Sequence, residues 1–487
     1  MNSLRQALLN ITHTENGALT FRSTLDSVMD FYYHAPAKRG RNEEVIALFQ
    51  AAYAEQPALA LLALFNLRDV RGGKGERASF RACLTWLAEH DPQAFGLVAP
   101  FVPHYGRWDD LIAFHAHSGV RDVIAEQLRA DCASARPSLL AKWMPSLKAS
   151  SARTRTLAHA WRKALGMSEQ EYRRTLSALR ARLRVVEVDM SARRWGEISY
   201  PAVPSRAAMI YRSAFARHDG ERYQAFLEAV RAGQAKINAG TLYPYELVHR
   251  AAEGDQTIQA LWDALPDYTQ GRVGLVVADV SGSMEDYRLP RSQARAIDVA
   301  IALAIYYAQR NRGPWAEMAI TFSARPSVIH IPREMPLHEA VRQMNKECGY
   351  NTDFQAIFEM LLGIARSQKI PPEQMPAAIW VVSDMEFDQA GHGTTNLEAV
   401  REKYTRVGYP MPVLVFWNVA SRGLQTPALA DQEGVVLVSG FSPSAFQAAL
   451  ENQVITPHQA MLRTLFSPRY ALLAERLGLT APADAVK

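Results

Sequence analysis

The hydrophobic and polar positions show two different kinds of periodicity along the chain. Up to residue 265, apolar residues recur every three or four positions, as in EEVIALFQAAYAEQ and RASFRACLTWLAEH, and Pro and Gly interrupt the pattern. This spacing predicts amphipathic helices, and no strongly alternating strand pattern occurs among them. We therefore expect an all-α domain over residues 1–265, either a helical-repeat (HEAT-like) solenoid with diverged repeats or a helical bundle.

The hydrophobic periodicity changes at Gly271. VGLVVADV is a continuous apolar run of strand length, typical of a buried parallel strand. Four similar runs follow (AEMAITFS, AAIWVVSD, MPVLVFWNV and GVVLVSG), most of them separated by helical patterns, and SVIHI indicates a short edge strand. This alternation predicts a doubly wound, Rossmann-like α/β domain over residues 271–440. Residues 441–487 return to a helical pattern and are expected to pack on either domain.

The composition is that of a soluble globular protein with two or more domains. The 487 residues are 48% hydrophobic and 21% charged. Neither a run of 18 apolar residues nor a cleavable leader occurs, so we expect no membrane segment and no signal peptide. Cys83, Cys132 and Cys348 lack metal-ligand spacing and fit reduced thiols. These features favour a cytoplasmic protein.

The net charge of +5 is unevenly distributed. Residues 271–487 carry a net charge of −1 and residues 1–270 a net charge of +6. Residues 141–240 alone hold 19 basic and 8 acidic residues. An excess of this size attracts polyanions, with nucleic acid as the default candidate. Ordinary solvated helix faces are the alternative, and charge alone does not decide between the two.

Oxygen-bearing side chains follow the strands of the predicted α/β domain. Asp279, Ser281 and Ser283 come directly after the first strand. Thr352 lies in a later loop before a helix, and Asp384 closes the strand AAIWVVSD. Parallel sheets place ligands at the carboxyl ends of their strands, and Mg²⁺ prefers oxygen ligands in near-octahedral geometry. The sequence therefore predicts a site for Mg²⁺ or another divalent cation.

The order and spacing of these residues resemble the metal-ion-dependent adhesion site of von Willebrand A domains. The resemblance implies that Ser281, Ser283 and Thr352 bind Mg²⁺ directly. It implies that Asp279 and Asp384 act largely through water, and that the sixth position accepts an acidic group from a partner. Neutral hydroxyl ligands leave the ion electrophilic, which favours capture of an external carboxylate or phosphate over generation of hydroxide. A degenerate site that binds no metal is the alternative.

Three more acidic residues lie close by in the sequence. Glu386 and Asp388 follow the strand-terminal aspartate and are interpreted as a solvated acidic loop rather than as catalytic groups. Asp353 is expected to cap the next helix rather than to contact metal.

Two polar segments of the helical half also carry candidate chemistry. LRDVRGGKGER, residues 67–77, gathers basic side chains about a Gly-Gly turn that suits phosphate, and an interhelical turn with internal ion pairs is the equal alternative. It is not a Walker loop. In YGRWDDL, residues 105–111, Arg107 and Trp108 could stack on a base, although a structural Trp between helices is more common.

Several sequence motifs, taken together, resemble those of a known family. TENGA, LRDVRGGKGER, YGRWDDL, LAKWMPSLK, EVDMSARRWGEISYPAVPSRA and KINAGTLYPYELV occur in this order before the α/β domain. They resemble a large family of unknown function related to TROVE proteins, the Ro-type RNA-binding proteins. The resemblance implies helical repeats that form a ring closed by a von Willebrand A domain. It also implies a ribonucleoprotein that binds small non-coding or misfolded RNA.

Charge and loop position, not the resemblance, select the candidate RNA-binding residues. They are basic side chains of the polar segments and of the basic block: Arg71, Lys74, Arg77, Arg107, Lys142, Lys148, Arg153, Arg155, Arg193, Arg194, Arg206 and Lys236. Arg193 and Arg194 beside Trp195 are the most suggestive, with a helix end packing on Trp195 as the alternative.

We therefore expect a non-catalytic RNA-binding protein of Ro/TROVE type with a Mg²⁺-dependent docking site. The alternative is a metal-dependent protein–protein interaction module without an RNA role, whose partner donates an acidic residue to the ion. An enzyme such as a nuclease has little support, because no HExxH, triad signature or second metal set occurs. The oligomeric state is left open.

Overall fold

The computed structural model describes residues 10–183, 185–269, 274–289, 293–322, 326–346, 353–389, 395–421, 423–449 and 455–482. The chain forms two compact units. Unit 1 comprises residues 1–67, 71–79 and 239–487, and unit 2 comprises residues 68–70 and 80–238. The N-terminal segment therefore belongs with the C-terminal half, whereas the sequence pattern suggested a division at residues 265–271.

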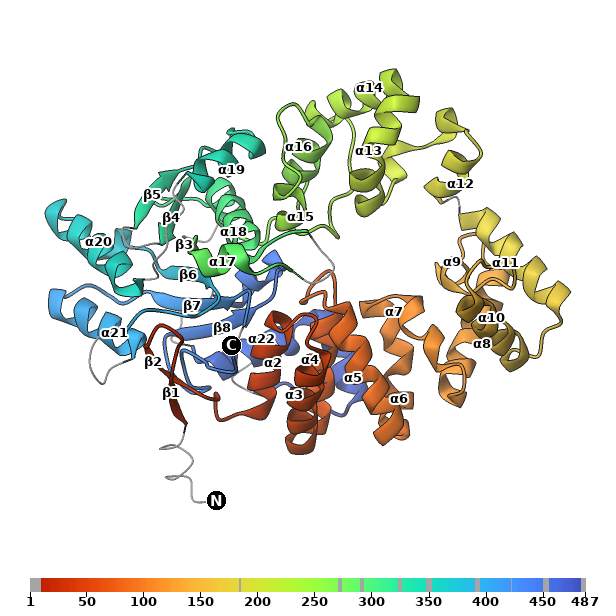
Figure 1. The fold of residues 1–487 in the computed structure, drawn as a ribbon, viewed down its shortest axis with the longest axis horizontal. Helices are drawn as coiled ribbons and strands as arrows, with labels where there is room; N and C mark the ends of the chain where they lie inside the picture. The colour runs from red at the N-terminus through yellow and green to blue at the C-terminus, as the bar shows by residue number, and fades with distance from the viewer. Residues whose placement is uncertain are drawn as a thin grey trace. The chain divides into compact units, whose positions relative to one another are not determined.

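Unit 1 is an α/β unit in which strands and helices alternate after residue 274 (Figure 1). Its strands are β1 (Ile11–His13), β2 (Leu19–Phe21), β3 (Leu275–Asp279), β4 (Met318–Phe322), β5 (Ser327–His330), β6 (Ala378–Ser383), β7 (Val413–Asn418) and β8 (Val435–Ser439). Its helices are α2 (Ser27–Ala37), α3 (Asn42–Glu55), α4 (Pro57–Arg68), α15 (Pro244–Val248), α16 (Gln256–Asp263), α17 (Gly282–Asp286), α18 (Ala296–Arg310), α19 (Leu337–Asn345), α20 (Phe354–Ser367), α21 (Asn396–Val407), α22 (Pro457–Leu465) and α23 (Ala471–Arg476), with 3-10 helices η6 (Pro372–Gln374), η7 (Pro443–Ala449) and η8 (Pro468–Tyr470). The strands and helices that the hydrophobic pattern predicted in this half are present.

The main sheet has six strands in the order β5-β4-β3-β6-β7-β8. Pairing is parallel from β4 through β8, and the edge strand β5 pairs antiparallel with β4, as the short SVIHI run indicated. The strand order reverses between β3 and β6. At such a point of a parallel sheet, the loops that follow the two strands leave in opposite directions and make room for a ligand.

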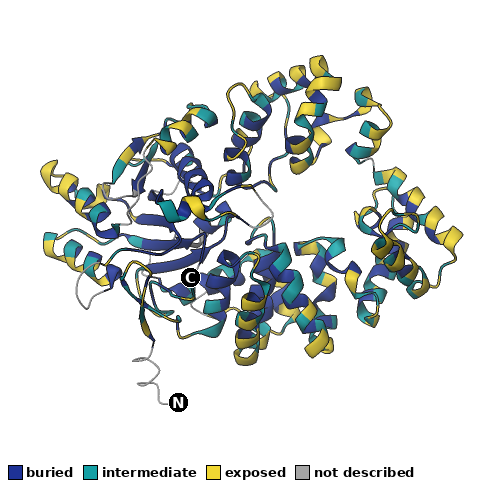
Figure 2. Ribbon diagram, viewed as in Figure 1, coloured by how far each residue is buried: buried dark blue, intermediate teal, exposed yellow. Residues whose placement is uncertain are grey.

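Aromatic side chains cover both faces of this sheet. Phe446 of η7 lies 5.6 Å from Trp380 on β6 and 4.9 Å from Trp417 on β7, measured between ring centroids. Phe416 of β7 faces Phe354 of α20 at 5.7 Å. Phe416 and Trp417 are successive residues of one strand, so they point to opposite faces. The strands β3, β6 and β8 are buried throughout (Figure 2), as expected for a sheet with helices on both sides.

The first 68 residues depart from the expected all-α half. β1 and β2 form an antiparallel hairpin, and isolated bridges join Leu19 to Thr395 and Phe21 to Thr426. α2 packs on β7 and β8 together with α22. From Val28 to Ala37 only Asp30 is not fully buried, and a helix buried on all sides is a core helix. The N-terminal segment is therefore part of the α/β core.

Unit 2 consists of helices joined by short turns. Its helices are α5 (Arg77–His90), which begins in the 71–79 segment, α6 (Pro92–Val98), α7 (Val102–Tyr105), α8 (Ser118–Ala133), α9 (Leu140–Trp143), α10 (Ala152–Ala164), α11 (Glu169–Leu183), α12 (Val186–Ser191), α13 (Ser205–His218) and α14 (Gly220–Arg231), with 3-10 helices η1 (Ala99–Phe101), η2 (Trp108–Asp110), η3 (Ile112–Phe114), η4 (Trp195–Glu197) and η5 (Tyr200–Ala202). These helices keep exposed outer faces (Figure 2). The all-α prediction therefore holds for this unit.

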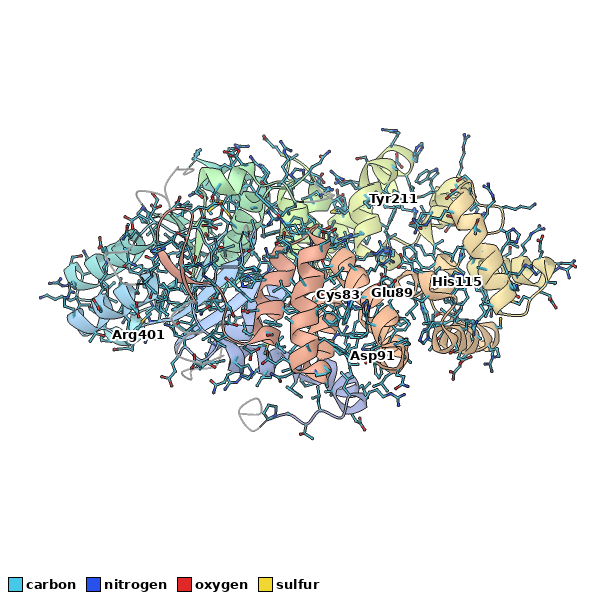
Figure 3. All side chains as sticks on the ribbon, turned by 60° about the horizontal axis from the view of Figure 1, so that its bottom comes forward. Cys83, Glu89, Asp91, His115, Tyr211 and Arg401 are labelled. Atoms are coloured by element: carbon cyan, nitrogen blue, oxygen red, sulfur yellow. The ribbon has the colours of Figure 1, made fainter. Side chains whose placement is uncertain are left out.

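The described part of residues 441–487 packs within unit 1. The Asn66 side-chain amide donates a hydrogen bond to the Tyr470 hydroxyl at 3.0 Å, and α22 contacts β8. Cys83 is buried in α5 (Figure 3), Cys132 is exposed, and neither forms a disulfide; Cys348 lies outside the described residues. Among the described residues, every helix is too short or too polar to cross a membrane.

Candidate functional site

The carboxyl ends of two adjacent strands bring the aspartates of the candidate metal site to one edge of the sheet. Asp279 is the last residue of β3, and Asp384 directly follows the end of β6. β3 and β6 are parallel neighbours at the point where the strand order reverses. Both aspartates therefore lie where α/β sheets bind ligands.

The Asp279 carboxylate is fully buried and is held from two sides. Its Oδ1 accepts the N–H of Ser281 at 2.9 Å, and its Oδ2 accepts the Ser383 hydroxyl at 2.6 Å. Burial, followed by the nearby Asp384 carboxylate, raises the pKa of Asp279 to about 7, while the hydrogen bonds from the two serines lower it. Because both oxygens already accept hydrogen bonds, this carboxylate is better placed to orient the loop than to bind a cation directly.

The two serine hydroxyls of the loop lie side by side. Ser281 Oγ and Ser283 Oγ are 3.1 Å apart, with Ser281 buried and Ser283 partly exposed. Adjacent ligands of an octahedral Mg²⁺ with bonds of about 2.1 Å are about 3 Å apart. The hydroxyl pair therefore fits two neighbouring positions of one ion. Thr352, the third expected hydroxyl, lies outside the described residues.

The loop after β6 carries a strained residue next to Asp384. Met385 has a φ of +69°, a left-handed conformation that costs free energy for a residue with a side chain, and it is buried. The Met385 N–H donates to Ser383 Oγ at 3.0 Å, and the Glu386 N–H donates to Asp384 Oδ1 at 3.3 Å. These local hydrogen bonds fix the conformation of the loop that carries Asp384.

The N-terminal segment holds the same loop from outside. The Glu15 N–H donates to Glu386 Oε2 at 2.7 Å, and the Asn16 side chain donates to Glu386 O at 2.7 Å. The Gln425 side-chain amide donates to the other carboxylate oxygen. Glu386 is only 2% exposed, so the prediction that it belongs to a solvated acidic loop is wrong.

Two further contacts complete this attachment. The Thr14 hydroxyl donates to Phe387 O at 2.8 Å, and an isolated bridge joins Gly17 to Asp388. Sequence reasoning missed the attachment because the partners lie 370 or more residues apart. The available sequence signal for this attachment was the TENGA motif, and the hydrophobic periodicity assigned that motif to the helical half.

The donor set limits the kind of metal that this edge could hold. Among the described residues, no three His, Cys, Asp or Glu side chains are arranged to hold a metal ion. A cation here would depend on hydroxyl oxygens, which suits a hard ion such as Mg²⁺. Asp353 accepts the N–H groups of Gln355 and Ala356 at 3.0 Å each, so it caps α20 as expected.

The LRDVRGGKGER segment is an interhelical turn rather than an open phosphate loop. The Lys74 N–H donates to Asn66 O at 3.0 Å, and Glu76 forms a 2.5 Å ion pair with Arg39. Gly75 has a φ of +72°, and a Cβ there would lie 1.9 Å from the Tyr243 hydroxyl, so only glycine fits. The interhelical turn is therefore the correct alternative, although its ion pairs are made with residues outside the segment, such as Arg39.

Lys74 is a mistaken RNA-binding candidate. The residue is 4% exposed, and its ammonium nitrogen lies 4.8 Å from the centre of the Tyr32 ring. Burial lowers the pKa of Lys74 to about 7. The sequence could not show this, because the residue is covered by α2 and by Gly440, which follows β8.

YGRWDDL builds a buried charge cluster, which we call the Asp110 cluster. Asp110 accepts hydrogen bonds from Arg68 Nε at 2.9 Å, from Arg81 Nε at 2.5 Å and from the Arg107 N–H at 3.0 Å. A Cβ at Gly106 would lie 2.6 Å from the same carboxylate. Burial raises the pKa of Asp110, but Arg68 and Arg81 outweigh it, and the pKa is lowered. Asp110 therefore has a structural role, and the Arg107 guanidinium lies 5.3 Å from the Trp143 ring centroid.

The remaining candidate cations divide by their surroundings. Some are engaged within the fold: Arg155 donates to Ala149 O and Ser150 O, Arg194 pairs with Asp189 and Glu197, Lys142 lies 3.8 Å from Glu187, and Arg77 is partly buried. Arg71 and Arg206 are exposed, although each has interactions within the fold. Those that are exposed and make no ion pair within the described part of the chain are Lys148, Arg153, Arg193 and Lys236.

These features define a chain that joins an all-α unit to an α/β unit with hydroxyl and carboxylate groups at the carboxyl ends of its parallel strands. Residues 14–100 and 113–273, just over half of the chain, match the family model described as "Domain of unknown function (DUF2828)". The chain therefore belongs to the DUF2828 family, which confirms the resemblance to a family of unknown function. Residues 274–466 match a second model, "Domain of unknown function (DUF7788)".

Two known proteins are similar over most of the chain. The "Uncharacterized protein L728" of Acanthamoeba polyphaga mimivirus is 27% identical over 511 residues, covering 94% of this chain and 88% of that protein. The crystal structure of the Deinococcus radiodurans RO (RSR) protein covers 87% of this chain and 92% of that chain, with 16% identity and a TM-score of 0.40.

Proposed function

We propose that the protein is a non-catalytic RNA-binding protein of the cytoplasm, in which unit 2 binds the RNA and unit 1 carries a Mg²⁺-dependent docking site. The separation of charge supports the RNA-binding part. The block of 19 basic and 8 acidic residues falls in unit 2. Exposed cations without an ion pair, which lie on α10 and in the turns between helices, suit a phosphate backbone, because neutralising phosphates releases counterions without breaking ion pairs within the protein.

A matched pair of triple variants tests this assignment in the full chain. In unit 2, Lys148→Gln, Arg153→Gln and Lys236→Gln remove three exposed cations. In unit 1, Arg312→Gln, Arg366→Gln and Lys369→Gln make the same change in net charge at exposed positions. We expect the wild type to bind structured and single-stranded RNA with an affinity that falls as salt rises. The triple variant of unit 2 should lower this affinity, and the triple variant of unit 1 should not. Absence of RNA binding by the wild type at about 50 mM salt would refute the proposal.

The docking-site part rests on the serine pair. Ser281 and Ser283 would hold the ion directly, with Thr352 as the third hydroxyl ligand. Asp279 and Asp384 would orient the loops and bind through water, as in the von Willebrand A domains that the sequence resembles. A bound Mg²⁺ would supply an electrophilic position for an acidic group of a partner, since neutral hydroxyls leave its charge largely uncompensated.

Magnesium titration of the full chain tests the docking site. A ligand at about a hundred times its Kd stabilises the state that binds it by about 2.7 kcal/mol. We expect Mg²⁺ to raise the unfolding midpoint of the wild type. The double variant Ser281→Ala, Ser283→Ala should lose this response, while Ser213→Ala, an exposed serine of unit 2, should keep it. Equal responses in all three proteins would contradict the assignment.

A second candidate function is a metal-dependent protein–protein interaction module without RNA. The partly exposed Ser283 at the sheet edge favours it, because a partner carboxylate could reach an ion there. Capture of a protein partner that needs Mg²⁺ and fails with Asp279→Ala, in a chain that binds no RNA, would select this function. The proposal of an RNA-binding protein also includes a relation to TROVE proteins and a ring-shaped helical half.

A further inference from the structure

One helix of unit 2 ends on a residue of unfavourable backbone conformation. The Arg193 N–H donates to Met190 O and the Arg194 N–H donates to Asp189 O, at 3.1 and 2.9 Å. This hydrogen-bond pair is the Schellman ending of α12, and it places Arg193 at a φ of +57°. Glycine usually occupies this position, because a side chain in the left-handed region costs free energy.

Other helix ends of the chain show the usual solution. Gly166, Gly233, Gly408 and Gly478 have positive φ and make the same pair of hydrogen bonds after α10, α14, α21 and α23. In the described part of the chain, Lys369 after α20 is the other residue besides Arg193 that is not glycine in this arrangement. A strained residue is a reason to ask what the side chain does.

Arg193 lies two residues before Trp195, which forms a stack with a second aromatic ring. Trp195 and His218 lie 4.5 Å apart between centroids with their planes 15° from parallel. His218 is exposed and Trp195 is partly exposed. Arg193 is exposed and makes no ion pair within the described residues, whereas Arg194 is neutralised by two acidic neighbours.

The loop that carries this stack is held rigidly. The Arg222 guanidinium donates to Trp195 O at 2.6 Å and to Ile198 O at 2.7 Å, and it lies 4.6 Å from the Tyr200 ring centroid. The Tyr211 hydroxyl on α13 (Figure 3) donates to Glu187 Oε1 on α12 at 3.4 Å. A platform that is ordered before binding loses little conformational entropy on binding.

We propose that Arg193, Trp195 and His218 form a subsite for an unpaired nucleotide of single-stranded RNA. A base would extend the Trp195–His218 stack, and the Arg193 guanidinium would bind the adjacent phosphate. Arg193 lies two residues from Trp195, so their Cα atoms are within about 7 Å, the scale of one nucleotide. This subsite rests on the proposed RNA-binding function and names the residues and the form of RNA for it.

Two glycine substitutions test the subsite. Arg193→Gly and Lys369→Gly each remove one cation and each place glycine in the same helix ending, so their effects on net charge and on backbone strain match. Lys369→Gly also controls for the favourable interaction of a cation with a helix C-terminus. We expect both variants to remain folded, with unfolding midpoints unchanged or raised by about 1–3 °C.

The binding measurements use a fluorescent single-stranded RNA of about 12 nucleotides and the duplex of the same sequence. We expect Arg193→Gly to lower single-strand affinity about five- to tenfold and to reduce the slope of log affinity against log salt by about 0.7, while Lys369→Gly changes neither. His218→Ala should lower single-strand affinity about tenfold and leave duplex binding unchanged, because only an unpaired base can join the stack.

The failures of the subsite and of the function beneath it are distinguishable. If Arg193→Gly and His218→Ala bind the single strand as tightly as the wild type, the subsite is overturned and RNA binding stands. Wild-type protein that binds neither RNA at low salt overturns both. An equal loss in Arg193→Gly and Lys369→Gly would assign the effect to net charge and also overturn the subsite.

Discussion

Buried charged groups of the two units can have very different surroundings. In unit 2 the buried Asp110 carboxylate accepts hydrogen bonds from two guanidinium groups, and the unpaired cations lie at the surface. In unit 1 Asp279 is buried near a second carboxylate, and Lys74 is buried against an aromatic ring. Buried charges with matched partners stabilise a fold, whereas buried charges without them are costly and occur where a site requires them. The difference separates the structural Asp110 cluster from the sheet edge for which we propose a docking site.

Removing the central charge of the Asp110 cluster should have the largest effect on stability. Asp110→Asn leaves Arg68, which is 3% exposed, without its carboxylate, and breaking a buried pair in this way costs about 3–5 kcal/mol. Chemical denaturation at pH 7 measures it. The pKa of Asp110 is lowered below its usual 3.8, so the wild type keeps this stability above that pH and loses it as the pH falls further. A difference from wild type that persists unchanged in strong acid would contradict the charge-based explanation.

Removing the buried charge of Lys74 should raise the stability of the protein, whereas removing that of Asp110 should lower it. Lys74→Met removes a buried ammonium group and keeps an apolar stem, which we expect to raise the free energy of unfolding by about 1–4 kcal/mol at pH 7. Burial lowers the pKa of Lys74 from 10.5 to about 7, so the wild type loses stability as the pH falls from 10.5 to 7. The gain should therefore vanish above pH 10.5. A variant that is no more stable than wild type in urea at pH 7 would show that Lys74 has a compensating role.

The loop that carries Asp384 offers an intermediate test. Both oxygens of Glu386 accept N–H groups, from Glu15 and from Gln425. Glu386→Gln points an amide N–H at one of these donors, which we expect to cost about 1–3 kcal/mol of stability. Denaturation of the variant measures the loss. The Mg²⁺ response should also weaken, and a variant with unchanged stability would mean that the N-terminal segment does not hold the loop.

The smallest effect is expected at the surface of unit 2. Glu197 is exposed, and its carboxylate pairs with Arg194 at 3.1 Å. Exposed ion pairs contribute little because water screens them. Glu197→Gln should leave the unfolding midpoint unchanged within error and, by freeing part of the Arg194 charge, should not weaken RNA binding. Weaker RNA binding would show that this pair orders the loop beside Trp195.

Much of the α/β unit could be predicted from the sequence. The apolar runs around Val277, Trp380 and Phe416 are long enough, and close enough to the following polar residues, to mark the strands and their carboxyl ends. Asp353 was placed as a helix cap from its position alone, and its two hydrogen bonds confirm it. These are local properties, and local periodicity and capping are encoded within a few residues.

The polar segments of the N-terminal half were harder to interpret. LRDVRGGKGER and YGRWDDL look alike as sequence, since each combines glycine with cations and aspartate or glutamate. Only the structure shows that Glu76 pairs with Arg39 and that Asp110 accepts from Arg68. The partners are 37 and 42 residues away, and no short window of sequence contains both members of either pair.

The spacing of apolar residues was enough to predict the strands of the sheet and the Asp279, Ser281 and Ser283 loop at the end of the first strand. The tertiary structure decided which units the segments join, that Glu386 and Lys74 are buried, and that Arg193 ends its helix in a strained conformation. The physical reason is that periodicity depends on neighbouring residues, whereas burial and charge pairing depend on residues brought together by the fold, such as Glu15 and Glu386 across 371 positions.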